Sequence, residues 1–186
     1  MTTAMQSTLY GPVPQHLFQQ AKNIRLLICD VDGVFSDGRI YMGNNGEELK
    51  TFHTRDGYGI KSLMAAGVDV AIITGRRSQI VENRMSALGI QHIYQGQDNK
   101  LAAYLDIVNK LGIAAEYTAY IGDDLIDWPV MAEVGLSVCV ADGHPLLSQR
   151  ADLTTRIKGG YGAVREVCDL ILEARGELDQ HKGLSI

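Results

Sequence analysis

Acidic, hydroxyl and basic side chains follow the ends of apolar segments in this sequence. Asp30 and Asp32, in the segment DVDGV, come directly after a short apolar run and lie two residues apart. In extended chain this spacing places both carboxylates on one side. Their charges then repel each other, and a divalent cation is the usual remedy. Further polar groups follow later apolar runs or open a helix: Thr74, Gly75 and Arg76 (TGR), Lys100, and Asp123 (GDD).

These residue types suit phosphoryl transfer through a covalent intermediate. Asp30, Asp32 and Asp123 would form an oxygen-rich site of the kind that Mg²⁺ prefers. Asp30 would attack phosphorus in line. Asp32 would protonate the leaving oxygen and later deprotonate the hydrolytic water, a contribution of roughly 10²- to 10⁴-fold in rate. Thr74 and Lys100 would hold the other phosphate oxygens, and Lys100 would offset charge in the transition state.

The elements that must position these groups alternate along the chain. Short apolar runs that end abruptly are typical of buried parallel strands, and amphipathic segments between them predict helices. This alternation predicts an α/β fold, a Rossmann-like parallel sheet with helices on both faces. Ligands of such sheets bind outside the carboxyl ends of the strands. The expected strands are 24–29, 68–73, 117–121 and 136–140, and the expected helices are 59–66, 78–88 with Ser78 as N-cap, 99–111 and 163–174.

One segment breaks the alternation. Residues 38–53 contain two short strand patterns around Asn44-Asn45-Gly46, which is a hairpin turn signal. We expect this hairpin to project from the carboxyl end of the first strand. The chain of 186 residues then forms one domain, 1–186, with a C-terminal tail over 175–186 and no room for a cap domain.

The bulk composition narrows the function classes. A net charge of −5 with scattered basic residues argues against nucleic-acid binding, which needs a focused basic face. No segment approaches the roughly 20 consecutive apolar residues of a membrane span, and no signal peptide precedes the first helix. Cys29, Cys139 and Cys168 lie far apart beside apolar residues, which predicts buried free thiols in a reducing cytoplasm.

The motifs together resemble a known superfamily. The segments DVDGV, TGR, Lys100 and GDDLID, in this order, are similar to the four motifs of the haloacid-dehalogenase superfamily. The longer segments YMGNNGEELKTFHTRDGYGIK, AIITGR, YIGDDLIDWPVM and GGYGAVREVCDLIL resemble the family of 3-deoxy-D-manno-octulosonate 8-phosphate phosphatases over nearly the whole chain. The resemblance implies an uncapped, Mg²⁺-dependent phosphatase acting through an aspartyl-phosphate, which supplies a sugar for lipopolysaccharide.

The resemblance also implies a homotetramer and a set of substrate contacts. In this family the hairpins pack together at the centre, and the tail, here ending Gly183-Leu184-Ser185-Ile186, can approach a neighbouring site. Arg84 is expected to act across a subunit boundary. His53 departs most from the family pattern, where Asn is also accepted. The substrate-binding residues carried over are Asp32, His53, Thr54, Arg55, Asp56, Gly57, Lys61, Gly75, Arg76, Arg84 and Lys100.

Several alternatives remain open on the residues alone. Asp127 is either a first-turn helix acid or a group that supports the metal indirectly, and Asp124 is expected to support Lys100 or its loop. A related acidic sugar phosphatase, such as an N-acylneuraminate 9-phosphatase, fits the basic set equally. A phospho-receiver domain also clusters aspartates, a threonine and a lysine, but its phosphoacceptor follows the third strand, not the first. A catalytically inactive scaffold is disfavoured because every expected reactive residue is present.

Overall fold

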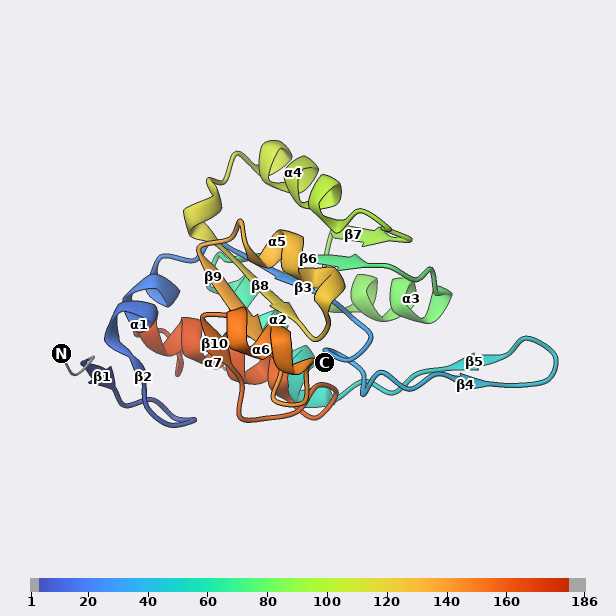
Figure 1. Ribbon diagram of the computed structural model, residues 1–186, viewed down its shortest axis with the longest axis horizontal. Helices are drawn as coiled ribbons and strands as arrows, with labels where there is room; N and C mark the ends of the chain where they lie inside the picture. Colours follow the sequence, from blue (N-terminus) through green and yellow to red (C-terminus); the bar gives the residue numbers. More distant parts are fainter. Residues whose placement is uncertain (1–3, 181–186) are drawn as a thin grey trace.

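The computed structural model describes residues 4–180 and centres on a parallel sheet (Figure 1). Its six strands lie in the order β10-β9-β8-β3-β6-β7, so β3 (Leu26–Cys29) lies between β6 (Asp69–Thr74) and β8 (Thr118–Gly122). The outer strands are β7 (His92–Gln95), β9 (Leu136–Cys139) and β10 (Leu153–Thr154). The strand pairs are parallel and in register, with Cys29 opposite both Ile72 and Ile121. The predicted α/β parallel sheet is confirmed.

Side chains alternate between the two faces of the sheet, and each face is covered by helices. Leu27 and Cys29 of β3 belong to one apolar core, whereas Leu26 and Ile28 belong to the other. Figure 1 shows α4 and α7 on opposite sides of the sheet. The first core is covered by α1 (Gln15–Lys22), α2 (Thr54–Ala65), α3 (Gln79–Leu88) and α7 (Ala163–Arg175), and the second by α4 (Lys100–Leu111), α5 (Trp128–Met131) and α6 (Pro145–Arg150).

Some elements were missed or misplaced by the sequence patterns. The strands β7 (His92–Gln95) and β10 (Leu153–Thr154) extend the sheet at its two edges, where apolar runs are short and half-exposed. The helix α2 begins at Thr54, five residues before the expected start, because His53 Nδ1 accepts a hydrogen bond from Arg55 N and caps it. Ser78 occupies the N-cap position of α3 as predicted, but its hydroxyl makes no capping hydrogen bond.

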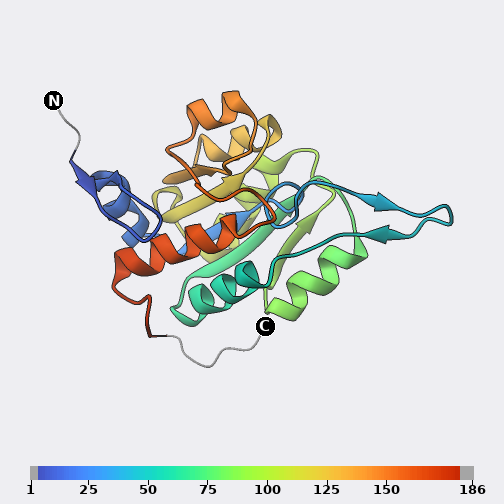
Figure 2. The ribbon, with the colours of Figure 1, turned by 90° about the horizontal axis from the view of Figure 1, so that it is seen from below.

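The remaining strands form two small antiparallel pairs outside the main sheet. In the N-terminal arm, β1 (Met5–Gln6) pairs with β2 (Val13–Pro14). In the predicted hairpin, β4 (Tyr41–Met42) pairs with β5 (Glu48–Leu49), and the turn closes with Gly43 N donating to Glu47 O at 2.8 Å. Figure 2 shows the hairpin reaching far beyond the body of the molecule.

Two further expectations concern the chain ends and the membrane. Residues 181–186 of the predicted tail, including the terminal Gly183–Ile186 segment, lie outside the described residues. In the described range, no helix combines the length and apolar character that crossing a bilayer requires.

Candidate active site

The carboxyl ends of the three central strands bring the predicted reactive residues together. Asp30 follows β3, Thr74 ends β6 and Asp123 follows β8. Since β3 pairs with both β6 and β8, these groups lie at one edge of the sheet. Lys100, the first residue of α4, reaches the same edge and completes the group.

Asp30 is a buried carboxylate with one oxygen engaged and one open. Its Oδ2 lies 3.0 Å from Lys100 Nζ, whereas Oδ1 is buried without a hydrogen-bond partner in the described part of the chain. Burial and the nearby Asp127 charge raise the pKa of Asp30 to about 7, although Lys100 acts in the opposite direction. An unpaired buried carboxylate oxygen is costly, so Oδ1 is suited to bind a ligand that this chain does not supply.

Asp127 anchors the neighbouring groups. Its Oδ1 accepts hydrogen bonds from Lys100 Nζ at 2.7 Å and Tyr120 Oη at 2.6 Å. Its Oδ2 accepts from the backbone N–H groups of Asp123 at 3.0 Å and Asp124 at 3.3 Å. A carboxylate has about four acceptor positions, and all are used here. Asp127 therefore holds Lys100 and the loop that carries Asp123. It is also the first-turn acid of the short 3-10 helix Leu125–Asp127, and its indirect support of a metal stays a prediction.

The support expected from Asp124 is confirmed for the loop and corrected for the lysine. Asp124 is exposed, and its Oδ1 accepts a hydrogen bond from Leu125 N at 2.7 Å at the start of the short 3-10 turn Leu125–Asp127. The lysine is bound by Asp127 instead.

Asp123 supplies the second open carboxylate. Its side chain presses against the backbone of Gly33, where an added Cβ would lie 2.1 Å from Asp123 Oδ2 and where φ is +90°. Only glycine meets both demands. Burial, followed by the charges of Asp30 and Asp127, raises the pKa of Asp123 to about 8.

Together these groups form what we call the carboxylate cluster: Asp30, Asp123 and Asp127, with Lys100 against it. One oxygen from each carboxylate lies within 4.8 Å of the others. Burial lowers the pKa of Lys100, but the charges of Asp30 and Asp127 outweigh this and raise it above its ordinary value. One ammonium cannot neutralise three carboxylates, as the raised pKa values of Asp30 and Asp123 indicate. The donor set and its charge deficit fit a divalent cation such as Mg²⁺.

The Asp32 carboxylate contacts cations outside this cluster, and its place among the metal ligands stays a prediction. Lys50 Nζ donates a hydrogen bond to Asp32 Oδ1, and Arg76 Nε lies 4.0 Å from Asp32 Oδ2. Glu48 Oε1 lies 3.7 Å from both Lys50 Nζ and Arg76 Nη2. We call these four residues the hairpin network, because Glu48 and Lys50 come from the returning strand of the hairpin and the residue after it.

Lys50 is the residue that sequence reasoning missed. Its side chain is 0% exposed, whereas a lysine in a polar hairpin is normally solvated, so the sequence carried no local signal for its burial. Thr74 is buried at the end of β6, next to Gly75, and both stay candidates for phosphate contact.

The predicted sugar contacts outside the strand ends lie on α2 and α3 or just before α2. His53, Thr54 and Arg55 lie at the N-terminus of α2, with Thr54 and Arg55 exposed, and Lys61 is half-buried further along the same helix. In α3, Arg84 lies beside Gly57, where an added Cβ would be 2.6 Å from its Nη2. None of these cations takes part in the ion pairs of the carboxylate cluster among the described residues.

Two of the predicted sugar contacts, Asp56 and Gly57, are buried in this chain, and their contact with the sugar stays a prediction. Asp56 is 0% exposed and its Oδ1 accepts a hydrogen bond from Arg165 N at 2.8 Å, which joins α2 to the start of α7. Burial raises its pKa to about 6, although that hydrogen bond and nearby arginines act against the shift. Gly57 is buried in α2, where Arg84 and Leu88 leave no room for a side chain.

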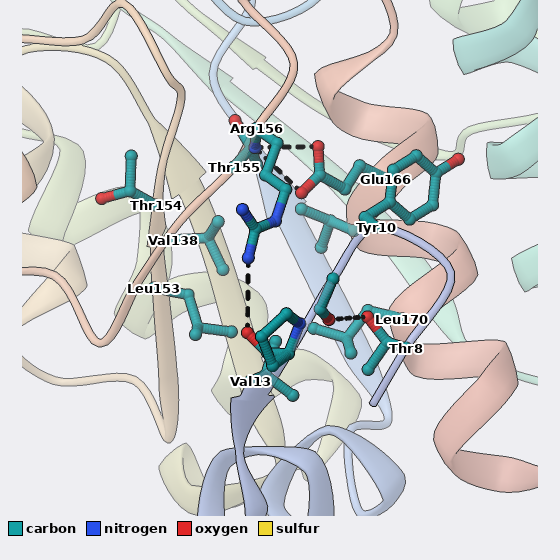
Figure 3. Close-up of a pocket in the computed structure, with 13 residues that line it drawn as sticks. Thr8, Tyr10, Val13, Val138, Leu153, Thr154, Thr155, Arg156, Glu166 and Leu170 are labelled. Atoms are coloured by element: carbon teal, nitrogen blue, oxygen red, sulfur yellow. Dashed lines mark hydrogen bonds between the residues drawn. The ribbon is translucent and has the colours of Figure 1, made fainter. Parts of the chain in front are cut away.

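The cavity in Figure 3 lies elsewhere in the molecule. It is enclosed by the N-terminal arm, β9 (Leu136–Cys139), β10 and α7, and none of the predicted site residues lines it. Its polar groups are satisfied internally: the Glu166 carboxylate accepts hydrogen bonds from Arg156 N, and Arg156 Nη2 donates to Pro12 O. The cavity is packing space beneath the arm and offers no reactive group.

Comparison with known proteins places the chain among enzymes with this arrangement. Residues 86–165 match the family model of haloacid dehalogenase-like hydrolases. The 3-deoxy-D-manno-octulosonate 8-phosphate phosphatase of Salmonella typhi is 64% identical over 183 residues, 98% of this chain and 97% of that protein. The crystal structure of the Yersinia pestis phosphatase of the same name has a TM-score of 0.97 and 63% identity, with both chains covered completely.

A more distant structure shows such a fold with its ligands. The Moraxella catarrhalis 3-deoxy-D-manno-octulosonate 8-phosphate phosphatase, crystallised with a magnesium ion, a phosphate ion and the sugar, has a TM-score of 0.87 and 45% identity over 89% of this chain and 91% of that one. With the identity, coverage and fold all in agreement, this chain belongs to the 3-deoxy-D-manno-octulosonate 8-phosphate phosphatase family of haloacid dehalogenase-like hydrolases.

Proposed function

We propose that this protein is a Mg²⁺-dependent phosphatase that hydrolyses 3-deoxy-D-manno-octulosonate 8-phosphate to the free sugar acid and phosphate, a step in lipopolysaccharide biosynthesis. Beyond family membership, one observation carries this function. Asp30 Oδ1 is buried and unpaired while Oδ2 is held 3.0 Å from Lys100 Nζ. A carboxylate held in this way has one oxygen fixed and one oxygen that still lacks a partner among the described residues.

Asp30 and Asp123 would hold the Mg²⁺ ion, and Asp127 would fix the loop that carries Asp123. When bound, the ion supplies the positive charge that lets an anionic carboxylate approach an anionic phosphate. Asp30 then attacks phosphorus, the phosphorus–oxygen bond to the sugar breaks, and an aspartyl-phosphate forms. Asp32 gives its proton to the departing sugar alkoxide.

The second half of the reaction reverses the proton transfer. Asp32, now ionised, takes a proton from a water molecule that attacks the phosphorus of the aspartyl-phosphate. Phosphate leaves and the Asp30 carboxylate is restored. Lys100 and Thr74 would bind the non-bridging oxygens, and Lys100 offsets the charge that builds up on them in both transition states.

Recognition of the sugar acid falls to the cations outside the carboxylate cluster. Arg76 is half-exposed beside Asp32 and would meet the substrate near the scissile bond. His53, Thr54, Arg55, Lys61 and Arg84 would recognise the sugar carboxylate and hydroxyls. We also propose a homotetramer in which Arg84 acts across a subunit boundary, and the absence of Arg84 from the ion pairs of its own chain's carboxylate cluster is consistent with this.

Two surface features accompany this proposal. The hairpin exposes Tyr41, Met42 and Leu49 by 51%, 76% and 67%, and contact between hairpins of several copies would cover them. Cys29, Cys139 and Cys168 are free and buried, which supports a reducing cytoplasmic location.

The test is phosphate release from 3-deoxy-D-manno-octulosonate 8-phosphate and from N-acetylneuraminate 9-phosphate, each with and without Mg²⁺. We expect Mg²⁺-dependent turnover that strongly favours the first sugar. Preference for the second would overturn the substrate, and activity that ignores a metal chelator would overturn the metal-dependent mechanism.

A further inference from the structure

The hairpin network contains a buried ammonium that the proposed chemistry does not yet use. The side chain of Lys50 is 0% exposed, although it comes from the base of a hairpin whose strands are otherwise largely exposed. Removing an ammonium from water is costly unless opposite charges are close. Here the charges are Asp32, which accepts the Lys50 hydrogen bond, and Glu48, whose Oε1 is 3.7 Å from Lys50 Nζ.

We propose that Lys50 is the positioning residue for Asp32, holding the carboxylate that exchanges a proton with the sugar oxygen. This inference rests on the proposed phosphatase function and deepens it. Lys50 binds Oδ1 of Asp32, whereas Oδ2 has only the longer contact with Arg76 Nε at 4.0 Å and is the oxygen that meets the leaving group. Asp32 follows β3 in a turn and has a side chain 21% exposed, so without Lys50 several rotamers would be open to it.

Glu48 fixes Lys50 in turn. Its Oε1 is buried, lies 3.7 Å from both Lys50 Nζ and Arg76 Nη2, and makes no hydrogen bond within the described residues. The four side chains therefore alternate in sign around a closed circuit, from Asp32 to Lys50 to Glu48 to Arg76 and back to Asp32. Because Glu48 and Lys50 both belong to the returning limb of the hairpin, the position of the hairpin determines the position of the proton donor.

Leaving-group dependence separates this role from a merely structural one. A sugar alkoxide needs a proton in order to leave, whereas p-nitrophenolate leaves without one. Displacing Asp32 should therefore slow hydrolysis of the sugar phosphate and spare p-nitrophenyl phosphate. A general loss of structure would slow both.

The experiment compares kcat/KM of Lys50→Met on both substrates with that of wild type and of Lys110→Met. Lys110 is a matched control because it pairs with Asp106 on the exposed surface of α4. We expect Lys50→Met to lose about 10- to 100-fold on 3-deoxy-D-manno-octulosonate 8-phosphate, part of the ~10²- to 10⁴-fold that general acid–base catalysis supplies. On p-nitrophenyl phosphate we expect less than about a threefold loss, and Lys110→Met should match wild type on both.

Two further variants keep the test decisive. Combining Lys50→Met with Glu48→Gln removes one charge of each sign, so no carboxylate of the network is left uncompensated and the risk of misfolding is lower. We expect this variant to lose kcat/KM on the sugar phosphate and to keep it on p-nitrophenyl phosphate. In an Asp32→Asn background, Lys50→Met should cause no further loss on the sugar phosphate, because both changes remove one function. Equal losses of Lys50→Met on the two substrates would overturn the positioning role. Additive losses when Lys50→Met is combined with Asp32→Asn would overturn it too. Failure of wild type to hydrolyse the sugar phosphate would instead refute the proposed function.

Discussion

The carboxylate cluster and the cations around α2 and α3 differ in how they are held. Asp30 follows β3, Lys100 opens α4 and Asp127 follows β8, and all three side chains are buried. Lys100 Nζ lies 3.0 Å from Asp30 Oδ2 and 2.7 Å from Asp127 Oδ1. Arg55 and Arg84 are exposed or half-exposed, and among the described residues neither joins an ion pair of that cluster. One chain therefore completes the part of the site that is proposed to handle phosphate, whereas the part proposed to recognise the sugar stays open on its surface.

This contrast follows from the sheet. Strands that are parallel and adjacent must end at the same edge, so residues placed after them converge without help from the surface. Side chains on the outer helices are not brought together by the strand pairing. The positions of long cationic side chains there depend on the residues that pack against them. We expect changes in the cluster to abolish chemistry, and changes around α2 to alter substrate preference or stability with chemistry largely intact.

The largest effect is expected for Asp30→Asn. An amide can neither attack phosphorus nor balance the charge of a divalent cation, so kcat should fall at least about 10⁴-fold. Steady-state phosphate release measures it, and Asp106→Asn, an exposed aspartate of α4, serves as the matched control. Substantial Mg²⁺-dependent activity in Asp30→Asn would show that the nucleophile is another residue.

The next largest effect is expected for Lys100→Met. This change keeps the length of the side chain but removes the ammonium from between Asp30 and Asp127. Both the phosphate contact and the stabilisation of transition-state charge are lost, so kcat should fall about 10²- to 10³-fold. The measurement is single-turnover phosphate release at saturating Mg²⁺. A change in KM alone would mean that Lys100 only binds substrate.

Proton competition should produce a smaller, pH-dependent effect on metal binding. The pKa values of Asp30 and Asp123 are about 7 and about 8 without a metal, so below these values Mg²⁺ must displace protons. With both carboxylates ionised in the bound state, the apparent affinity should therefore rise roughly 10²- to 10³-fold between about pH 6 and about pH 8. Isothermal titration in buffers of different ionisation enthalpy would count the protons released.

Asp123→Asn serves as the control for this metal-binding prediction. The amide is uncharged and does not titrate in this pH range, so we expect weak Mg²⁺ binding whose affinity depends less on pH. If Asp123→Asn bound Mg²⁺ as wild type does, the proposed ligand role of Asp123 would be wrong.

The smallest effect on activity is expected for Asp56→Asn, which tests whether Asp56 contacts the sugar. The folded-state pKa of about 6 lies above the ordinary aspartate pKa of 3.8, so ionised Asp56 destabilises the fold. The wild type should lose stability as pH rises from about 4 to about 6, and Asp56→Asn should remove this loss. We expect a gain of about 1–2 kcal/mol in unfolding free energy at pH 7, with kcat/KM within about threefold of wild type.

Urea unfolding of wild type and Asp56→Asn at about pH 4.5 and about pH 7 would measure this gain. The substitution keeps an oxygen for the hydrogen bond from Arg165 N, so the comparison isolates the charge. A large loss of activity at unchanged stability would instead support the predicted contact between Asp56 and the sugar.

Sequence patterns alone predicted the α/β sheet, the hairpin and the convergence of Asp30, Asp123 and Lys100. These predictions succeeded because each depends on a local signal. An apolar run that ends at an aspartate indicates the end of a buried strand, and Asn-Asn-Gly indicates a turn. The edge strands β7 and β10 were missed because half-exposed strands lack the continuous apolar run that marks β3 and β6.

The tertiary structure decided which charged groups are partners. Asp56 stands beside Arg55 in a segment that reads as a ligand-binding loop, yet it is buried beneath Arg165 of a helix 109 positions further along the chain. Lys50 reads as a solvated hairpin lysine, yet it is buried against Asp32. The sequence determined which strands end in carboxylates, because burial and chain reversal leave local patterns. Only the folded chain determined what each carboxylate pairs with, because ion pairing depends on distances between segments that no local pattern records.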